Sequence, residues 1–142
     1  MQQIFYSGKA KKHTIKYDIG ICIHTGFIVW IGGGVPGSVH DLTLAQEGIA
    51  KKFQNQIFVG DKGYVGDERF ITPFKNPQNE IQKLWNSELR KVRVSVEHTY
   101  SKFKLFHCLN TPWRHNIEYH PLVFQIIANL VNFDLIFHPI KQ

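Results

Sequence analysis

Apolar and polar residues alternate over residues 14–24, and this pattern restricts the fold more than any other feature of the chain. The apolar residues of the pattern occupy the odd positions: Ile15, Tyr17, Ile19, Ile21 and Ile23. A period of two is typical of a strand with one buried face. Residues 24–26 (HTG) have turn chemistry, and the β-prone run 27–31 (FIVWI) follows them. The pattern therefore predicts a β-hairpin.

The middle of the chain has weaker signals. The glycines at residues 32–34 and 37 predict the end of the second strand. Asp41 is placed to cap a helix that runs to residues 53–55, with an apolar face at Leu42, Ala45, Ile49 and Phe53. The apolar run 56–60 predicts a short buried strand that ends at Asp61, and the prolines of residues 65–86 predict a loop.

Two longer helices are expected in the second half of the chain. Ser87 is placed to cap a helix that runs to about Phe106, with an apolar stripe at Leu89, Val92, Val96, Phe103 and Phe106. Pro121 is at a first-turn position of the last helix. Residues 122–137 are apolar but include Gln125, Asn129, Asn132 and Asp134, so we expect a buried helix and no membrane span.

Size and composition favour one globular domain over residues 1–142, of mixed α/β class. The chain has 43% hydrophobic and 20% charged residues, which argues against intrinsic disorder. Its net charge of +6 favours a polyanionic partner. Cys22 and Cys108 form no CxxC motif and no disulfide framework, and no secretory leader is recognised, so we expect a reducing compartment.

Two carboxylates have contexts that suit chemistry. Asp61 follows a buried strand and lies between glycines, which allow close approach of a ligand. Glu97 is the acidic residue within a basic segment: Arg90, Lys91, Arg93, Lys102 and Lys104. Such an acid stays ionised and can hold a hard cation while its basic neighbours hold phosphates. The alternatives are that Asp61 is a turn residue and that Glu97 forms a helix-surface ion pair with Arg93.

The family resemblance rests on an ordered set of short segments. They are residues 6–9 (YSGK), 36–41 (PGSVHD), 60–64 (GDKGY) and 96–104 (VEHTYSKFK), together with 73–75 (PFK), 113–115 (WRH) and 127–131 (IANLV). In this order they resemble the DDE-superfamily endonuclease domain of the Harbinger-type transposases. The resemblance extends from about Phe5 to Phe137.

The resemblance implies a ribonuclease H-like fold, a mixed sheet with flanking helices, in which three carboxylates bind two divalent ions, Mg²⁺ or Mn²⁺. By position, Asp61 matches the second carboxylate and Glu97 the third. The implied activity is metal-dependent DNA cleavage and strand transfer. Arg90, Lys91, Arg93, Lys102 and Lys104 are the expected contacts to DNA phosphates. The resemblance also implies a separate helix-turn-helix partner, and a nuclear location in a eukaryote or a cytoplasmic one otherwise.

The chain departs from the family pattern at its first catalytic aspartate, which the family carries on a strand upstream of the YSGK segment. Residues 1–5 contain no acid, so we expect the first strand to be largely missing, the fragment to be inactive and the exposed sheet edge to self-associate. Asp18 and Asp41 are the candidates for a replacement ligand. The alternative function is a non-catalytic, domesticated DNA-binding or adaptor protein. A third alternative, a zinc module, would use His107, Cys108, His115 and His120, whose spacing matches no common zinc site.

Overall fold

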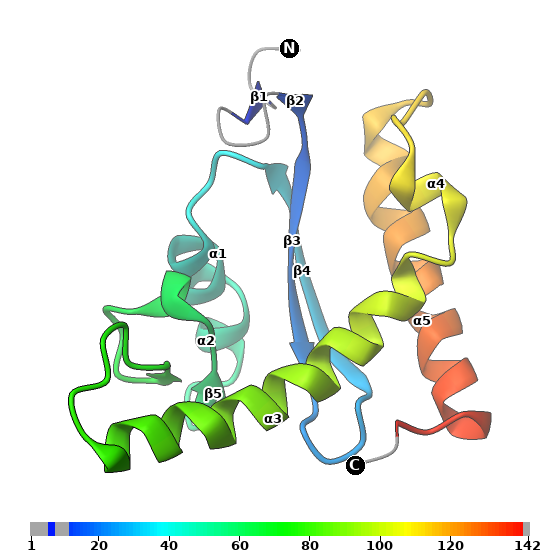
Figure 1. Ribbon diagram of the computed structural model, residues 1–142. Coiled ribbons are helices and arrows are strands. Elements are labelled where there is room, and N and C mark those ends of the chain that lie inside the picture. The colour runs from blue at the N-terminus through cyan, green and yellow to red at the C-terminus, as the bar shows by residue number, and fades with distance from the viewer. Residues whose placement is uncertain (1–5, 8–11, 141–142) are drawn as a thin grey trace. The chain divides into compact units, whose positions relative to one another are not determined.

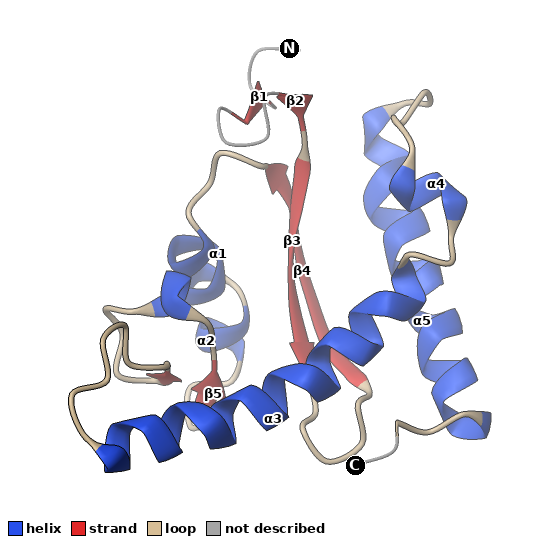
Figure 2. Ribbon diagram, viewed as in Figure 1, coloured by secondary structure: helices blue, strands red, loops and turns tan. Residues whose placement is uncertain are grey.

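The computed structural model describes residues 6–7 and 12–140. Its strands are β1 (Tyr6–Ser7), β2 (Lys12–His13), β3 (Ile15–Ile21), β4 (Ile28–Pro36), β5 (Phe58–Val59) and β6 (Phe70–Ile71). Its α-helices are α1 (Asp41–Glu47), α2 (Ile49–Lys52), α3 (Glu80–Phe103), α4 (His107–Asn110) and α5 (His120–Phe137), and its 3₁₀ helices are η2 (Lys62–Tyr64) and η3 (Ile117–Tyr119). Figures 1 and 2 show this mixture of helices and strands, which confirms the mixed α/β class.

The chain divides into two compact units. The first consists of Met1–Asp18 with Gly32–Arg90, and the second of Ile19–Ile31 with Lys91–Gln142. Strands β3 and β4 and helix α3 contribute residues to both units. Each unit is described below by itself, and the expectation of one domain over residues 1–142 stays a prediction.

The described strands pair two by two. β1 pairs with β2 in antiparallel orientation, β3 with β4, and β5 with β6 in parallel orientation. The β3–β4 turn is closed by hydrogen bonds from Cys22 N to Phe27 O and from Gly26 N to Cys22 O, both 2.8 Å. The predicted hairpin is therefore confirmed.

The glycines do not end the second strand, as the sequence predicted, because β4 continues through them to Pro36. Gly33 has φ +107°, and a Cβ atom on it would lie 2.7 Å from the carbonyl oxygen of Lys16 and 2.9 Å from Cα of Tyr17. Only a residue without a side chain fits this approach between two backbones. The glycine run therefore serves strand pairing.

The burial pattern of β3 also differs from the expectation. Asp18, which was expected on the polar face, is 6% exposed, whereas Ile15, Ile19 and Ile21 are only partly buried. Its Oδ2 accepts a hydrogen bond from Ile49 N (3.2 Å) at the start of α2. The single helix expected over residues 41–53 is interrupted at Gly48, so the carboxylate lies where an amide needs a partner.

Helix α3 begins at Glu80, seven residues before the predicted cap Ser87. Asn79 provides the cap, because its Oδ1 accepts a hydrogen bond from Gln82 N at 2.9 Å. Gln82 in turn accepts from Gln78 N at 2.6 Å. The helix ends at Phe103, three residues before the predicted end. Of the predicted stripe, Leu89 and Phe103 are buried, whereas Val92, Val96 and Phe106 are only partly buried, and Phe106 lies beyond the helix.

The predicted loop over residues 65–86 also contains strand β6, which the sequence pattern did not indicate. This strand has only two residues, too few for a periodic pattern. Phe70 is buried, and its ring stacks on Phe58 (5.3 Å between centroids) and on Tyr64 (5.1 Å). Aromatic packing therefore places β6 beside β5.

Helix α5 begins as predicted, with Pro121 in its first turn. One face is buried, with Phe124, Ile127, Ala128, Val131 and Leu135. The expectation of a buried helix holds for that face only, because the other exposes Leu122, Ile126, Leu130, Phe133, Ile136 and Phe137. By length and composition alone, residues 117–137 are long and apolar enough to cross a membrane, a test that core helices also pass.

The close approach at Gly33 gives the first prediction. We expect Gly33→Ala to destabilise the fold by about 2 kcal/mol or more, because the methyl group meets backbone atoms and the positive φ is strained for alanine. Urea denaturation followed by circular dichroism measures this. Gly32→Ala is the control, because its φ is not positive, and it should change stability by no more than about 0.5 kcal/mol. Equal effects of the two changes would contradict the explanation.

Candidate active site

Asp61 lies directly after Gly60, whose amide donates to Ile71 O (2.9 Å) at the end of the β5–β6 pair. The predicted position just beyond a strand is therefore confirmed, but β5 has only two residues and is partly buried, whereas a buried strand over residues 56–60 was expected. Asp61 is exposed, and its Oδ1 accepts a hydrogen bond from Gly63 N at 2.8 Å, which caps η2. The turn role that the sequence offered as an alternative is thus present. It uses one carboxylate oxygen and leaves the other free to bind a ligand.

Asp41 is the carboxylate that lies across Gly63 from Asp61. A Cβ atom on Gly63 would lie 3.0 Å from Asp61 Oδ1 and 3.4 Å from Asp41 Oδ2. Both carboxylates therefore lie next to the space that a side chain at residue 63 would occupy. Sequence reasoning named both residues but did not predict that they come together. The available signal was Gly63 itself, within the GDKGY segment.

The predicted capping role of Asp41 is wrong. His40 is the cap of α1, because its Nδ1 accepts a hydrogen bond from Leu42 N at 3.3 Å. Asp41 is the first residue of the helix and forms an ion pair with Lys16 (2.9 Å), with its side chain 50% exposed. A carboxylate in the first turn is favourable there in any case, because it faces free backbone amides.

Glu97 lies on α3 in the second unit, whereas Asp61 lies in the first. Its side chain is 67% exposed, and its Oε1 is 4.0 Å from Arg93 NH2, one helical turn earlier. The ion pair that was the alternative interpretation is therefore present. At this distance and exposure such a pair contributes about 0.5 kcal/mol or less, so it does little to restrain the Glu97 carboxylate.

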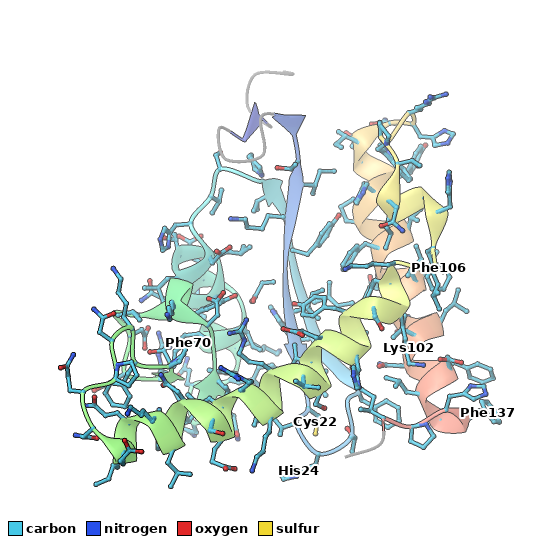
Figure 3. The ribbon with its side chains drawn as sticks, viewed as in Figure 1. Cys22, His24, Phe70, Lys102, Phe106 and Phe137 are labelled. Atoms are coloured by element: carbon cyan, nitrogen blue, oxygen red, sulfur yellow. The ribbon has the colours of Figure 1, made fainter. Side chains whose placement is uncertain are left out.

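The predicted DNA-contacting residues fall into two groups. Arg90, Lys91, Arg93 and Lys104 are exposed, with Lys104 just beyond the end of α3. Lys102 is only 20% exposed, and it forms an ion pair with Asp134 of α5. Figure 3 shows the Lys102 side chain extending from α3. Its charge is largely used within the second unit.

Asp134 is shared between two side chains, Lys102 and His138. It binds Lys102, and its Oδ1 is 2.8 Å from Nδ1 of His138. The hydrogen bond from Lys102, and secondarily that from His138, lowers the pKa of the Asp134 carboxyl below its ordinary value. Lys102, Asp134 and His138 together connect α3, α5 and the segment that follows α5.

The donor types fit a hard divalent cation better than zinc. Asp41 and Asp61 present carboxylate oxygens on either side of Gly63, and Mg²⁺ and Mn²⁺ prefer oxygen ligands. Within residues 6–7 and 12–140, no group of three or more His, Cys, Asp or Glu side chains has an arrangement that could hold a metal ion. This holds for His107, Cys108, His115 and His120 as well.

The fold combines helices and strands, with Asp61 after a strand end and Glu97 on a basic helix, and these features are consistent with a DDE nuclease domain. Residues 1–132 match the DDE superfamily endonuclease family, and the chain belongs to that family. A probable transposase for insertion sequence element IS702 from Microchaete diplosiphon is 32% identical over 142 aligned residues. The match covers 94% of this chain and 51% of that protein, so the chain spans about half of its length. No solved structure matches the chain.

The contacts of Lys102 give the second prediction. We expect Lys102→Met to lower the Tm by roughly 3–6 °C, because Asp134 loses its main partner. The lowered pKa of Asp134 means that its stabilising contribution is complete above about pH 4 and is lost as the pH falls through the lowered value. Melting curves should therefore show a smaller deficit of the variant at pH 3 than at pH 7. Lys104→Met, at an exposed position, is the control, and an equal loss there would contradict a structural role for Lys102.

Proposed function

We propose that the chain carries a metal-dependent DNA endonuclease and strand-transfer site of the transposase type, with Asp61 and Glu97 as its metal-binding carboxylates. The observation that supports this most is the geometry of Asp61, which follows a strand end and has Oδ1 held by Gly63 N at 2.8 Å. Family membership supports the reaction class. The printed name of the relative, a transposase for an insertion sequence element, supports DNA as the substrate.

Each group has a defined part in this proposal. Asp61 is fixed through one oxygen and offers the other, while the weak contact of Glu97 with Arg93 leaves its carboxylate available. A divalent cation bound by these carboxylates would supply the Lewis acidity that activates a water or a DNA 3′-hydroxyl and stabilises the leaving oxygen. The exposed basic residues of α3 would hold the DNA backbone through its phosphates.

Finer features of the proposal follow from the resemblance. We place the chain with the Harbinger-type transposases, with a ribonuclease H-like fold and a separate helix-turn-helix partner for site recognition. Two carboxylates supply only part of a hard cation's six ligands, so we expect residues 1–142 alone to bind metal weakly and to cleave DNA near background. We also propose that the protein self-associates. We further propose that it is located with its DNA substrate, which is in the nucleus of a eukaryote and in the cytoplasm otherwise.

The second candidate function is a non-catalytic DNA-binding or adaptor protein that has kept the family fold. The observation that favours it is the ion pair of Asp41 with Lys16 at 2.9 Å, which occupies the carboxylate that lies near Asp61. In that case DNA binding would survive while metal binding would be absent. The following two experiments separate these functions.

Metal binding is the third prediction. We expect Mn²⁺ to bind in the millimolar range, as followed by water proton relaxation, and Asp61→Asn and Glu97→Gln each to weaken binding at least tenfold, because each removes a charged oxygen ligand. Asp41→Asn should weaken it less, because Lys16 already neutralises that carboxylate. Glu47→Gln, an exposed change at the end of α1, is the control. Unchanged Mn²⁺ binding in Asp61→Asn would eliminate the proposed site.

DNA binding is the fourth prediction. Affinity should be sequence-tolerant and should fall steeply with salt, with log K decreasing by about 0.9 per phosphate contact for each log unit of salt. The double change Arg93→Glu and Lys104→Glu should flatten that slope by about two contacts. Lys51→Glu with Lys52→Glu, at the two exposed residues that end α2, is the control with the same change in net charge. If both double variants have the same slope of log K against log salt concentration, Arg93 and Lys104 contribute only to the net charge of the protein and make no specific phosphate contacts.

A further inference from the structure

Asp67 and Arg69 form the most completely paired ion pair of the first unit. Asp67 Oδ1 accepts from Arg69 N (3.0 Å) and Nε (2.9 Å), and Oδ2 accepts from Arg69 NH2 (2.6 Å) and Gln46 Nε2 (2.9 Å). The Asp67 side chain is 8% exposed. These hydrogen bonds hold the pKa of Asp67 well below its usual range, with Arg69 as the main cause. The carboxylate therefore has a partner for each lone-pair direction it presents.

The pair connects three segments of the first unit. Gln46 belongs to α1, and Arg69 NH1 donates to Ala50 O of α2 at 3.1 Å. Arg69 also pairs through its backbone, because its carbonyl oxygen accepts from Phe58 N (2.8 Å) at the start of β5. Arg69 thus contacts α2 with its side chain and β5 with its main chain, while its partner Asp67 contacts α1.

These segments are the supports of Asp61. β5 leads directly into Gly60 and Asp61, and the chain returns through η2 to Asp67. Both ends of this loop are therefore attached to Arg69 or its immediate partners. The α1 helix, which Gln46 attaches to the same pair, carries Asp41 at its other end, across Gly63 from Asp61.

We propose that Asp67 and Arg69 are positioning residues that fix the Asp61 carboxylate and its spacing from Asp41. The role of Asp61 itself rests on the proposed function. Asp67 and Arg69 act through the loop and through α1, since their side chains hydrogen-bond to Gln46, Ala50 and each other. Arginine is required because its planar group binds the carboxylate through two nitrogens and still reaches a carbonyl. Lysine cannot make all three contacts.

The Gly63 amide is the reporter for the test, because it donates to Asp61 Oδ1 and its NMR shift follows the geometry of that bond. We expect Arg69→Lys, Asp67→Asn and Gln46→Leu to move the Gly63 resonance toward its position in Asp61→Asn. Each should weaken Mn²⁺ binding at least fivefold. Lys51→Arg, at an exposed position in the same unit, is the control and should move neither readout.

The outcomes are distinct. If the variants lose stability in urea while the Gly63 resonance stays at its native position, the pair is structural only and the proposal is wrong. If the native chain binds no Mn²⁺, the proposed function fails, but the Gly63 resonance still decides whether the pair positions Asp61. If Asp67→Asn does not fold, Gln46→Leu, which keeps the ion pair, and Arg69→Lys decide by the same resonance.

Discussion

Buried polar groups that require partners determine how the short elements of this protein meet. The first unit contains helices of seven and four residues and strands of two, none of which is stable by itself in water. Asp18 supplies the acceptor for Ile49 N where the helical segment is interrupted. Asp67, with Arg69, joins the same helices to the β5–β6 pair. Because an unpaired buried donor or acceptor costs about 1–3 kcal/mol, these contacts select one arrangement of the elements.

The second unit follows the same rule with neutral groups. Asn132 of α5 binds the first residue of β4 twice, accepting from Ile28 N (2.8 Å) and donating to Ile28 O (2.9 Å). Its side-chain amide thus makes the two backbone hydrogen bonds that a neighbouring strand would otherwise make with Ile28. Thr99 of α3, with no exposed surface, donates to Gly26 O (2.9 Å) in the hairpin turn. The polar residues of these helices, which in sequence argue mainly against a membrane span, are therefore the groups that hold the hairpin to the helices.

Sequence patterns predicted the elements whose periodicity extends over several turns or residues. The β3–β4 hairpin, the apolar stripe of α3 and the start of α5 at Pro121 are examples. Patterns failed where one tertiary contact decides the outcome. The pattern places Asp18 on the polar face of its strand, but its carboxylate accepts a hydrogen bond from Ile49 N. The pattern ends the second strand at the glycines, but Gly33 lies against the backbone of Lys16 within the strand pair. Such contacts join residues far apart in sequence, which no local period encodes.

The candidate site shows the same division between local and distant information. The position of Asp61 at a strand end is a local property, and the sequence predicted it. Its nearness to Asp41 depends on α1 and η2 packing together, and Gly63 is the one local signal of that pairing.

The turn formed by Asp61 does not compete with a role in metal binding. A carboxylate that accepts one backbone amide has already lost most of its rotational freedom, so a ligand that binds its other oxygen has less side-chain entropy to overcome. Local turn geometry is therefore compatible with the proposed metal binding, since the turn orders the carboxylate that the proposed site requires.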